Sequence, residues 1–170
     1  MKSKFWKAVF AILIFTFALA VMGPYECAGL SAAVMVALLI GVSMGPLCSV
    51  ITVALYLVLG IWLPVYGGGG SGLGVLFGRE GGFLLVLLPC VLVIAALIKG
   101  MQKHPLLAAI LGLAISFVLY FAVGILWYVV CENASLVEVL GKGWGGSCLL
   151  FFLQCVLAFF VSGPLRRTVR

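Results

Sequence analysis

Few side chains in this chain of 170 residues could take part in covalent chemistry, and their spacing forms no catalytic set. There is no aspartate, so reactions that need paired aspartates are excluded. The one histidine, His104, precedes a proline, and we interpret it as a polar loop residue. The segment from Gly67 to Gly72 fits Gly-x-Gly-x-x-Gly, but it follows an apolar run and lacks the strand–turn–helix context of a dinucleotide site. The six cysteines contain no Cys-x-x-Cys pair. We therefore predict no enzyme, no cofactor and no metal site.

The remaining polar side chains favour the binding of a small solute. Arg79 is the sharpest candidate, because a guanidinium group matches a carboxylate with two parallel hydrogen bonds. Two alternatives for Arg79 are an ion pair with Glu80 and extension into solvent. Ligand pockets are mostly apolar with a few placed polar groups. The candidate polar lining is Arg79, Glu80, Asn133, Lys142 and Gln154, and the candidate walls are Tyr66, Phe77, Phe83, Trp127, Tyr128 and Trp144.

Composition and charge place the elements that carry these residues in a membrane. Hydrophobic residues make up 66% of the chain and charged residues 8%, against about 25% charged residues in soluble domains. The cations divide unevenly between the two sides of six apolar stretches, and all four glutamates fall on the side with fewer cations. Cytoplasmic loops carry the excess of Lys and Arg, so we predict that both termini are cytoplasmic. The cytoplasmic group is Lys2, Lys4, Lys7, Lys99, Lys103, Arg166, Arg167 and Arg170, and the outer group is Arg79 and Lys142.

We predict a single all-α membrane domain over residues 1–170, built as a bundle of six transmembrane helices. The spans are expected at about 5–22, 28–44, 47–63, 83–98, 105–130 and 146–163. A cleaved signal peptide is the alternative for the first span, since Ala18 to Ala20 has the small-x-small form of a cleavage site. The uncleaved interpretation is preferred.

Small residues recur every four positions along the second predicted span. Gly29, Ala33, Ala37, Gly41 and Gly45 would form one continuous stripe on a helix. In lipid, such stripes let helix backbones approach closely. The stripe either packs inside the bundle or docks a partner membrane protein, and we assign Ala33, Ala37 and Gly41 to partner docking.

The segment 64–82 gives the clearest indication of a site. It contains nine glycines together with Arg79, Glu80 and several apolar side chains. Loops of this length without regular structure are usually functional or disordered. Irregular backbone near the membrane is tolerated where it is buried in protein or lines a cavity. We therefore predict a loop that folds back over the outer mouth of the bundle.

Two runs in this region resemble the BioY family, the biotin-binding S-components of energy-coupling factor (ECF) transporters. Residues 63–68 are Leu-Pro-Val-Tyr-Gly-Gly, and residues 74–84 are Gly-Val-Leu-Phe-Gly-Arg-Glu-Gly-Gly-Phe-Leu. The similarity is dense from about residue 41 to 100 and weaker afterwards. It implies an S-component fold in the plasma membrane of a prokaryotic cell. It also implies a transmembrane coupling subunit and two cytoplasmic ATPase subunits as partners.

The resemblance also assigns residues to roles. The lid loop would be Gly67, Gly68, Gly69, Gly70 and Gly72, and Arg79 would lie where a ligand for the substrate carboxylate is expected. The family's usual Asp and Lys near the start of the last helix align with Phe151 and Gln154, so both charges are absent here. The amide of Gln154 could instead complement a ureido group. The predicted substrate-binding residues are Tyr66, Ser71, Arg79, Phe83 and Gln154.

We therefore expect a membrane subunit that captures biotin, or a similar small carboxylated vitamin, from outside the cell. Two alternatives remain open. The chain could be an S-component for a different vitamin or cofactor precursor, because the usual charged pair is absent. It could also be a structural membrane subunit with a degenerate pocket.

Overall fold

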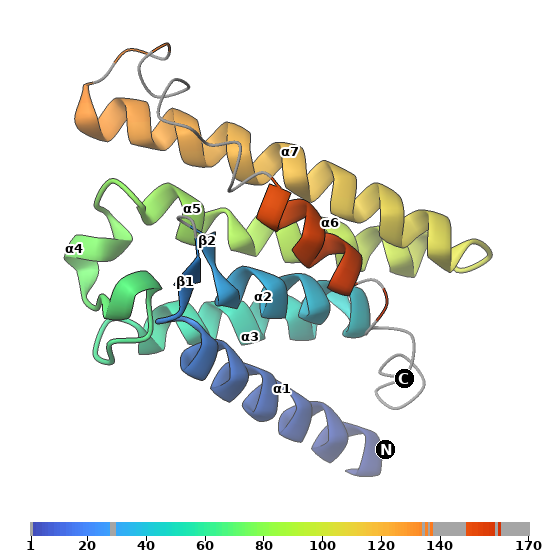
Figure 1. Cartoon of the computed structure of the whole chain (residues 1–170). Helices are drawn as coiled ribbons and strands as arrows, with labels where there is room; N and C mark the ends of the chain where they lie inside the picture. Colours follow the sequence, from blue (N-terminus) through green and yellow to red (C-terminus); the bar gives the residue numbers. More distant parts are fainter. Residues whose placement is uncertain are drawn as a thin grey trace.

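The computed structural model of the chain describes residues 2–27, 30–133, 135, 137, 149–158 and 160. These residues form a helical bundle with one very short hairpin (Figure 1). The helices are α1 (Lys2–Met22), α2 (Ala32–Ser43), α3 (Pro46–Leu59), the 3-10 turn η1 (Gly67–Gly69), α4 (Leu73–Leu76), α5 (Gly81–Leu85), α6 (Leu87–Gly100) and α7 (Pro105–Glu132). The antiparallel strands are β1 (Glu26–Cys27) and β2 (Leu30–Ser31), and a last helix, Leu149–Ala158, is called the C-terminal helix below.

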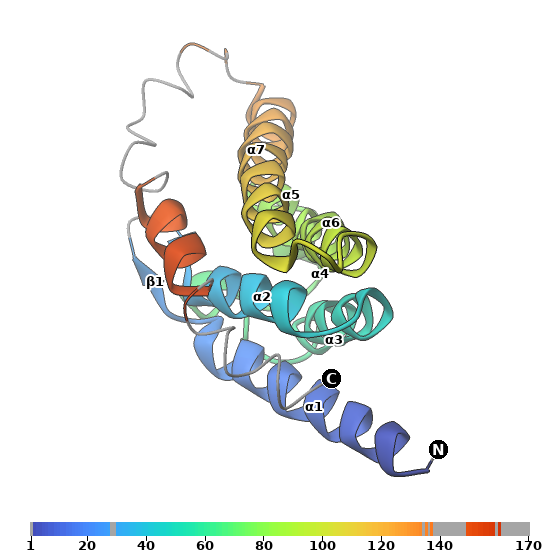
Figure 2. The same ribbon diagram turned by 90° about the vertical axis from the view of Figure 1, so that its right-hand side faces the viewer.

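The long helices run up and down the bundle in three layers. Seen nearly along the helix axes, α6 and α7 form one outer layer, α2 and α3 the middle layer, and α1 the other outer layer (Figure 2). The α6 helix packs against α7 on one side and against both α2 and α3 on the other. The α1 helix packs against α2 and α3. The middle layer is therefore covered on both faces, which accounts for the nearly continuous burial of α2.

Each of the six predicted spans contains a helix, so the all-α architecture expected from the sequence is confirmed for the described residues. The boundaries of two helices differ from the expectation. At about 1.5 Å per residue, the 12 residues of α2 and the 14 of α3 are shorter than a bilayer core of about 30 Å. The chain leaves α3 at Gly60 and begins α2 only after the β hairpin, because these residues instead form the loop and the hairpin. The segment Gly81–Gly100 and α7 are long and apolar enough to cross a membrane.

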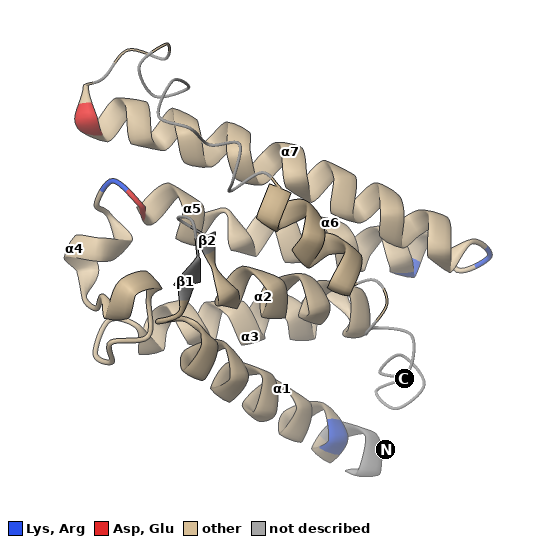
Figure 3. Ribbon diagram, in the orientation of Figure 1, with Lys and Arg blue, Asp and Glu red and all other residues tan. Residues whose placement is uncertain are grey.

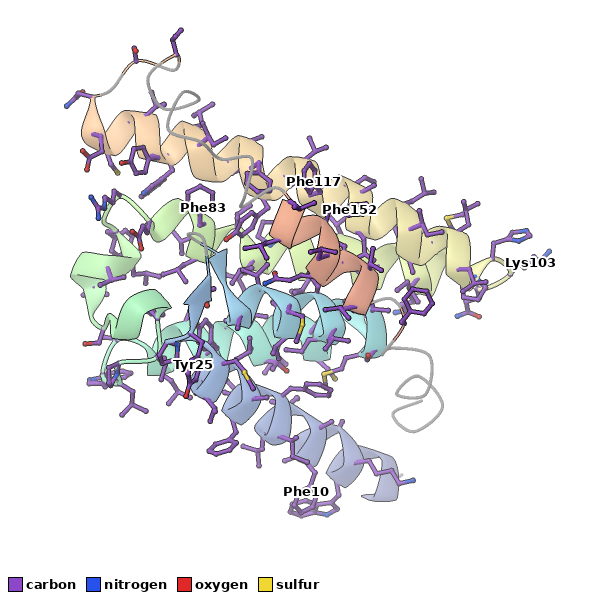
Figure 4. The ribbon with its side chains drawn as sticks, viewed as in Figure 1. Phe10, Tyr25, Phe83, Lys103, Phe117 and Phe152 are labelled. Carbon is purple, nitrogen blue, oxygen red and sulfur yellow. The ribbon has the colours of Figure 1, made fainter. Side chains whose placement is uncertain are left out.

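The described charged residues lie at the two opposite ends of the bundle (Figure 3). Lys7 lies near the start of α1, and Lys99 and Lys103 flank the connection from α6 to α7. Arg79 and Glu80 precede α5, and Glu132 ends α7 at the other end. Between the two ends, large apolar side chains face outward: Phe10, which is 60% exposed, points away from the bundle on α1 (Figure 4). Such a surface is stable in lipid and unfavourable in water.

The small-residue stripe of α2 lies inside the bundle. Ala33 and Ala37 are 1% and 0% exposed, and Gly41 is buried. A Cβ atom at Gly41 would lie 3.2 Å from the Cβ of Ile94 and 3.3 Å from the Cα of Val91, both on α6. At Gly41 the stripe is thus packed against α6 of the same chain. The docking of a partner at Ala33, Ala37 and Gly41 stays a prediction, and at Gly41 it would require α6 to move.

The contact between α6 and α7 fixes the helix that carries one wall of the site. Gly112 lies where an added Cβ would be 3.0 Å from the Cα of Ile94. One turn further, the Ser116 hydroxyl donates to the Cys90 carbonyl (3.2 Å), and the Cys90 thiol donates to the Ser116 carbonyl (3.5 Å). In an apolar environment such side-chain hydrogen bonds fix the register of two helices.

Candidate functional site

A cavity of about 160 Å³ lies at the end of the bundle that carries Arg79, Glu80 and the glycine-rich loop. It receives residues from β2, α2, the loop, α5, α6 and α7. It combines aromatic side chains, apolar side chains and polar groups in the way that a solute site requires. The lining residues are Ser31, Ala33, Val34, Gly67, Val75, Glu80, Phe83, Leu84, Leu87, Tyr120 and Tyr128.

A second, larger cavity of about 600 Å³ lies between α7 and the C-terminal helix, where Figure 4 labels Phe117 and Phe152. Its lining is apolar throughout, from Ile110 and Leu113 on α7 to Cys155 and Phe160. It offers no polar group to orient a solute. The smaller cavity is therefore the candidate site, although its volume is less.

The wall between α5 and α7 depends on two glycines. The ring of Phe83 occupies the space where Gly124 lacks a side chain, and a Cβ there would overlap that ring. Phe83 then lies against Tyr120, with 5.3 Å between ring centroids (Figure 4). Gly82, the residue directly before Phe83, leaves room for Trp127 of α7. A Cβ atom at position 82 would overlap the Cβ atom of Trp127. The two aromatic rings of α7 are thus packed on the first turn of α5.

The first half of the loop is anchored to the end of α3 by two tyrosines. The Tyr56 hydroxyl donates to the Val65 carbonyl (3.0 Å), and the Tyr66 hydroxyl donates to the Leu57 carbonyl. The ring of Tyr66 fills the space above Gly60, where a Cβ would overlap it. Burial raises the pKa of the Tyr66 phenol, so the hydroxyl remains a donor at all ordinary pH values.

The loop continues through backbone conformations that favour glycine. Gly68, Gly69 and Gly72 have φ angles of 64°, 78° and 90°, which side chains rarely adopt. The amide of Gly72 donates to the Gly60 carbonyl (2.9 Å) and returns the loop to the end of α3. This geometry explains the glycine run by backbone conformation, and the resemblance to a phosphate-binding pattern at Gly67–Gly72 has no further role.

The predicted substrate-binding residues are only partly brought together. Phe83 lines the cavity, as does Gly67 of the predicted lid. Arg79 is not a lining residue; its side chain is 60% exposed, and its Nε lies 3.7 Å from the Oε1 of Glu80, which does line the cavity. Ser71 is exposed on the loop. Tyr66 is fully buried against Gly60 and does not line the cavity, so its role in this structure is to anchor the loop.

Gln154 lies on the C-terminal helix and is not a lining residue of the cavity. Phe151, one turn before it, is fully buried and packs on Tyr120 with 5.0 Å between ring centroids. The Oε1 atom of Gln154 is buried and has no hydrogen-bond partner among the described residues. An unpartnered buried acceptor is unfavourable, so this atom is a candidate to accept a hydrogen bond from a ligand.

Ser31, Val34 and Tyr120 line the cavity but were not among the residues predicted from the sequence. A signal for Tyr120 was present, because Tyr120, Gly124 and Tyr128 recur every four residues and so share one face of α7. Among the other candidates, Trp127 and Phe77 do not line the cavity. Asn133 directly follows α7 as its C-cap residue and has a left-handed backbone conformation, with a φ of 48°. Lys142 and Trp144 lie outside the described residues.

Comparisons with known proteins agree on one family. A model of the BioY family matches residues 1–170. The chain is 32% identical over 111 residues to a protein named biotin transporter BioY from Rhodobacter capsulatus. That match covers 64% of this chain and spans 56% of the length of the Rhodobacter protein.

A solved structure shows the same fold. The S-component for biotin from an ECF-type ABC transporter superposes with a TM-score of 0.79, at 21% sequence identity. The superposition covers 99% of this chain and 93% of that one. The predicted S-component fold is therefore confirmed.

The anchoring of the loop gives a first prediction. Replacing Tyr66 with Phe removes the donor to the Leu57 carbonyl but keeps the ring above Gly60. We expect a loss of about 1 kcal/mol in the free energy of unfolding and faster amide exchange at residues 66–72. Thermal unfolding in detergent and hydrogen–deuterium exchange measure the two effects. Tyr25→Phe is the control, since Tyr25 is exposed, and equal behaviour of the two variants would contradict the anchoring role.

Proposed function

This chain belongs to the BioY family and is a membrane protein, and we propose that it is the subunit of an ECF-type importer that captures biotin from outside the cell. Biotin combines a fused ring carrying a ureido group with a chain that ends in a carboxylate. The observation that carries the proposal is that Glu80, the ion-pair partner of Arg79, lines the cavity together with an aromatic wall formed by Phe83, Tyr120 and Tyr128. The aromatic wall suits the apolar faces of a ring, and Arg79 suits a carboxylate.

Arg79 is available to a ligand at low cost. Its contact with Glu80 joins two side chains that are 60% and 52% exposed, and exposed ion pairs contribute about 0–1 kcal/mol. A substrate carboxylate held away from water would make a stronger, charge-assisted pair with the guanidinium. We propose that the carboxylate of the bound solute replaces Glu80 as the partner of Arg79.

The ureido group is assigned to Gln154. The Gln154 amide provides one acceptor and two donor hydrogens, which can complement a ureido N–H and carbonyl. Its Oε1 atom is the buried acceptor that lacks a partner. Since Phe151 lies between this helical turn and Tyr120, the proposal requires the Phe151 ring to move when the solute enters.

The volume of the cavity implies that capture includes an opening step. Sites for small molecules usually measure about 300–1,000 Å³, which exceeds the 160 Å³ present here. We propose that the loop 64–82 opens, admits the solute and closes over it, with Gly67, Gly68, Gly69, Gly70 and Gly72 acting as the lid. Ser71 is carried by the same lid and would approach the solute on closure.

Equilibrium titration of the detergent-purified chain with biotin tests the proposal. We expect saturable binding with a submicromolar dissociation constant, corresponding to at least about 8 kcal/mol of binding free energy. Tryptophan fluorescence or retained radiolabelled biotin reports the bound fraction, and thiamine, which has no carboxylate, is the comparison ligand. Absence of binding at high micromolar biotin would contradict the proposal and favour the alternative, an S-component for another carboxylated vitamin.

The role of Arg79 is tested by the charge of the ligand. Arg79→Ala should weaken binding of biotin by about 10- to 100-fold, the effect of one charge-assisted hydrogen bond, and should change binding of biotin methyl ester much less. Dissociation constants for both ligands provide the measurement. Lys99→Ala, which removes a cation from the opposite end of the bundle, is the matched control. If the acid and the ester lose affinity equally, Arg79 does not bind the carboxylate.

Transport requires partners that supply energy. We propose a transmembrane coupling subunit and two cytoplasmic ATPase subunits, in the plasma membrane of a prokaryotic cell, with both termini of this chain cytoplasmic. The proposal is supported by the position of Lys7, Lys99 and Lys103 at one end of the bundle and of Glu80 and Glu132 at the other. Affinity purification of the chain from its native membrane should recover an ATPase. Recovery of membrane partners without any ATPase would favour the structural-subunit alternative.

A further inference from the structure

The last part of the loop, Leu73–Glu80, contributes to the wall of the cavity and is called the flap below. Val75 and Glu80, both in the flap, line the cavity. The flap follows Gly72, which has a φ of 90° and whose amide is bonded to the Gly60 carbonyl. Within the proposed lid movement of the loop, the flap therefore begins at a glycine that can absorb a change in backbone angle.

Two side chains of α7 donate to the flap at the Gly78 carbonyl: the Trp127 indole and, over a longer distance of 4.0 Å, the Cys131 thiol. The indole Nε1 of Trp127 donates to the Gly78 carbonyl at 2.9 Å, across 49 residues of sequence. The carbonyl of Gly78 also accepts from the amide of Gly81 at 3.0 Å. The indole therefore joins the end of the flap to the outer turn of α7. The close approach depends on Gly82, since a Cβ there would overlap Trp127.

Trp127 does not line the cavity, although its neighbour Tyr128 does. An effect of Trp127 on binding would therefore act through the flap and not through contact with the solute. We propose that Trp127 is a positioning residue whose hydrogen bond to Gly78 holds the flap closed and so sets the rate at which bound solute is released. This inference rests on the proposed function for the identity of the solute.

A single substitution separates this role from packing. Trp127→Phe removes the N–H donor and keeps an aromatic ring beside Gly82. We expect dissociation of biotin to be about fivefold faster, the factor given by a typical hydrogen bond, with the association rate unchanged within twofold. In the absence of any ligand, amide exchange at residues 73–80 should also be faster. Trp62→Phe is the matched control, because Trp62 is 73% exposed near the outer end of α3.

Stopped-flow kinetics and hydrogen–deuterium exchange on the full chain in detergent are the two measurements. Unchanged exchange in the flap, the same change in Trp62→Phe, or a slower association rate with unchanged dissociation would each overturn the proposal. If the unmodified chain binds no biotin, the proposed function fails, and the exchange of the ligand-free flap alone decides the role of Trp127. Should Trp127→Phe fail to fold, Trp127→Tyr, whose hydroxyl lies elsewhere on the ring, takes its place in the same measurements.

Discussion

The structure depends on satisfying the backbone polar groups of a chain that is apolar almost throughout. Within the long helices this is done by the helical hydrogen bonds, so the side chains can all be apolar. The loop between α3 and α5 satisfies only part of its carbonyls in that way, through η1 and α4. Here Tyr56 and Trp127 donate to the Val65 and Gly78 carbonyls, and Tyr66 ties the loop to the Leu57 carbonyl. The hydrogen bonds of these three aromatic side chains stabilise an irregular segment across the end of an apolar bundle.

Three aromatic contacts around the site each require a missing side chain opposite the ring. Tyr66 needs Gly60, Trp127 needs Gly82, and the Phe83 ring needs Gly124. The glycines around the site therefore have two distinct uses, since Gly68, Gly69 and Gly72 instead supply φ angles that other residues rarely adopt. Because glycine is used both for close packing and for backbone angle, the loop is well defined and still has points at which it can bend. This combination suits a segment that must exclude water when closed and admit a solute when open.

The site, like the rest of the bundle, contains few polar groups. Its aromatic wall is built by α5 and α7, and the register of α7 against α6 is fixed by the hydrogen bonds between Ser116 and Cys90. The charged groups of Arg79 and Glu80 remain solvated and their pairing is weak. The buried Oε1 atom of Gln154 is a polar atom inside the bundle that the described residues leave unpartnered. A ligand with a carboxylate at one end and a ureido group at the other would satisfy both places.

The local sequence predicted six long apolar segments in order, the all-α class and the position of the glycine-rich loop, because long apolar runs and glycine clusters are local properties. It also grouped Arg79, Glu80 and Phe83 at one end of the bundle. Only the tertiary structure set which face of each helix meets the cavity, the core or the lipid, and it divided the fourth apolar segment into α5 and α6. It packed Gly41 against α6, buried Ala33, Ala37 and Tyr66, and brought Ser31 and Tyr120 to the cavity. The reason is physical: a helix that is apolar on every side carries no polar face to mark its orientation, so only packing against its neighbours can set it.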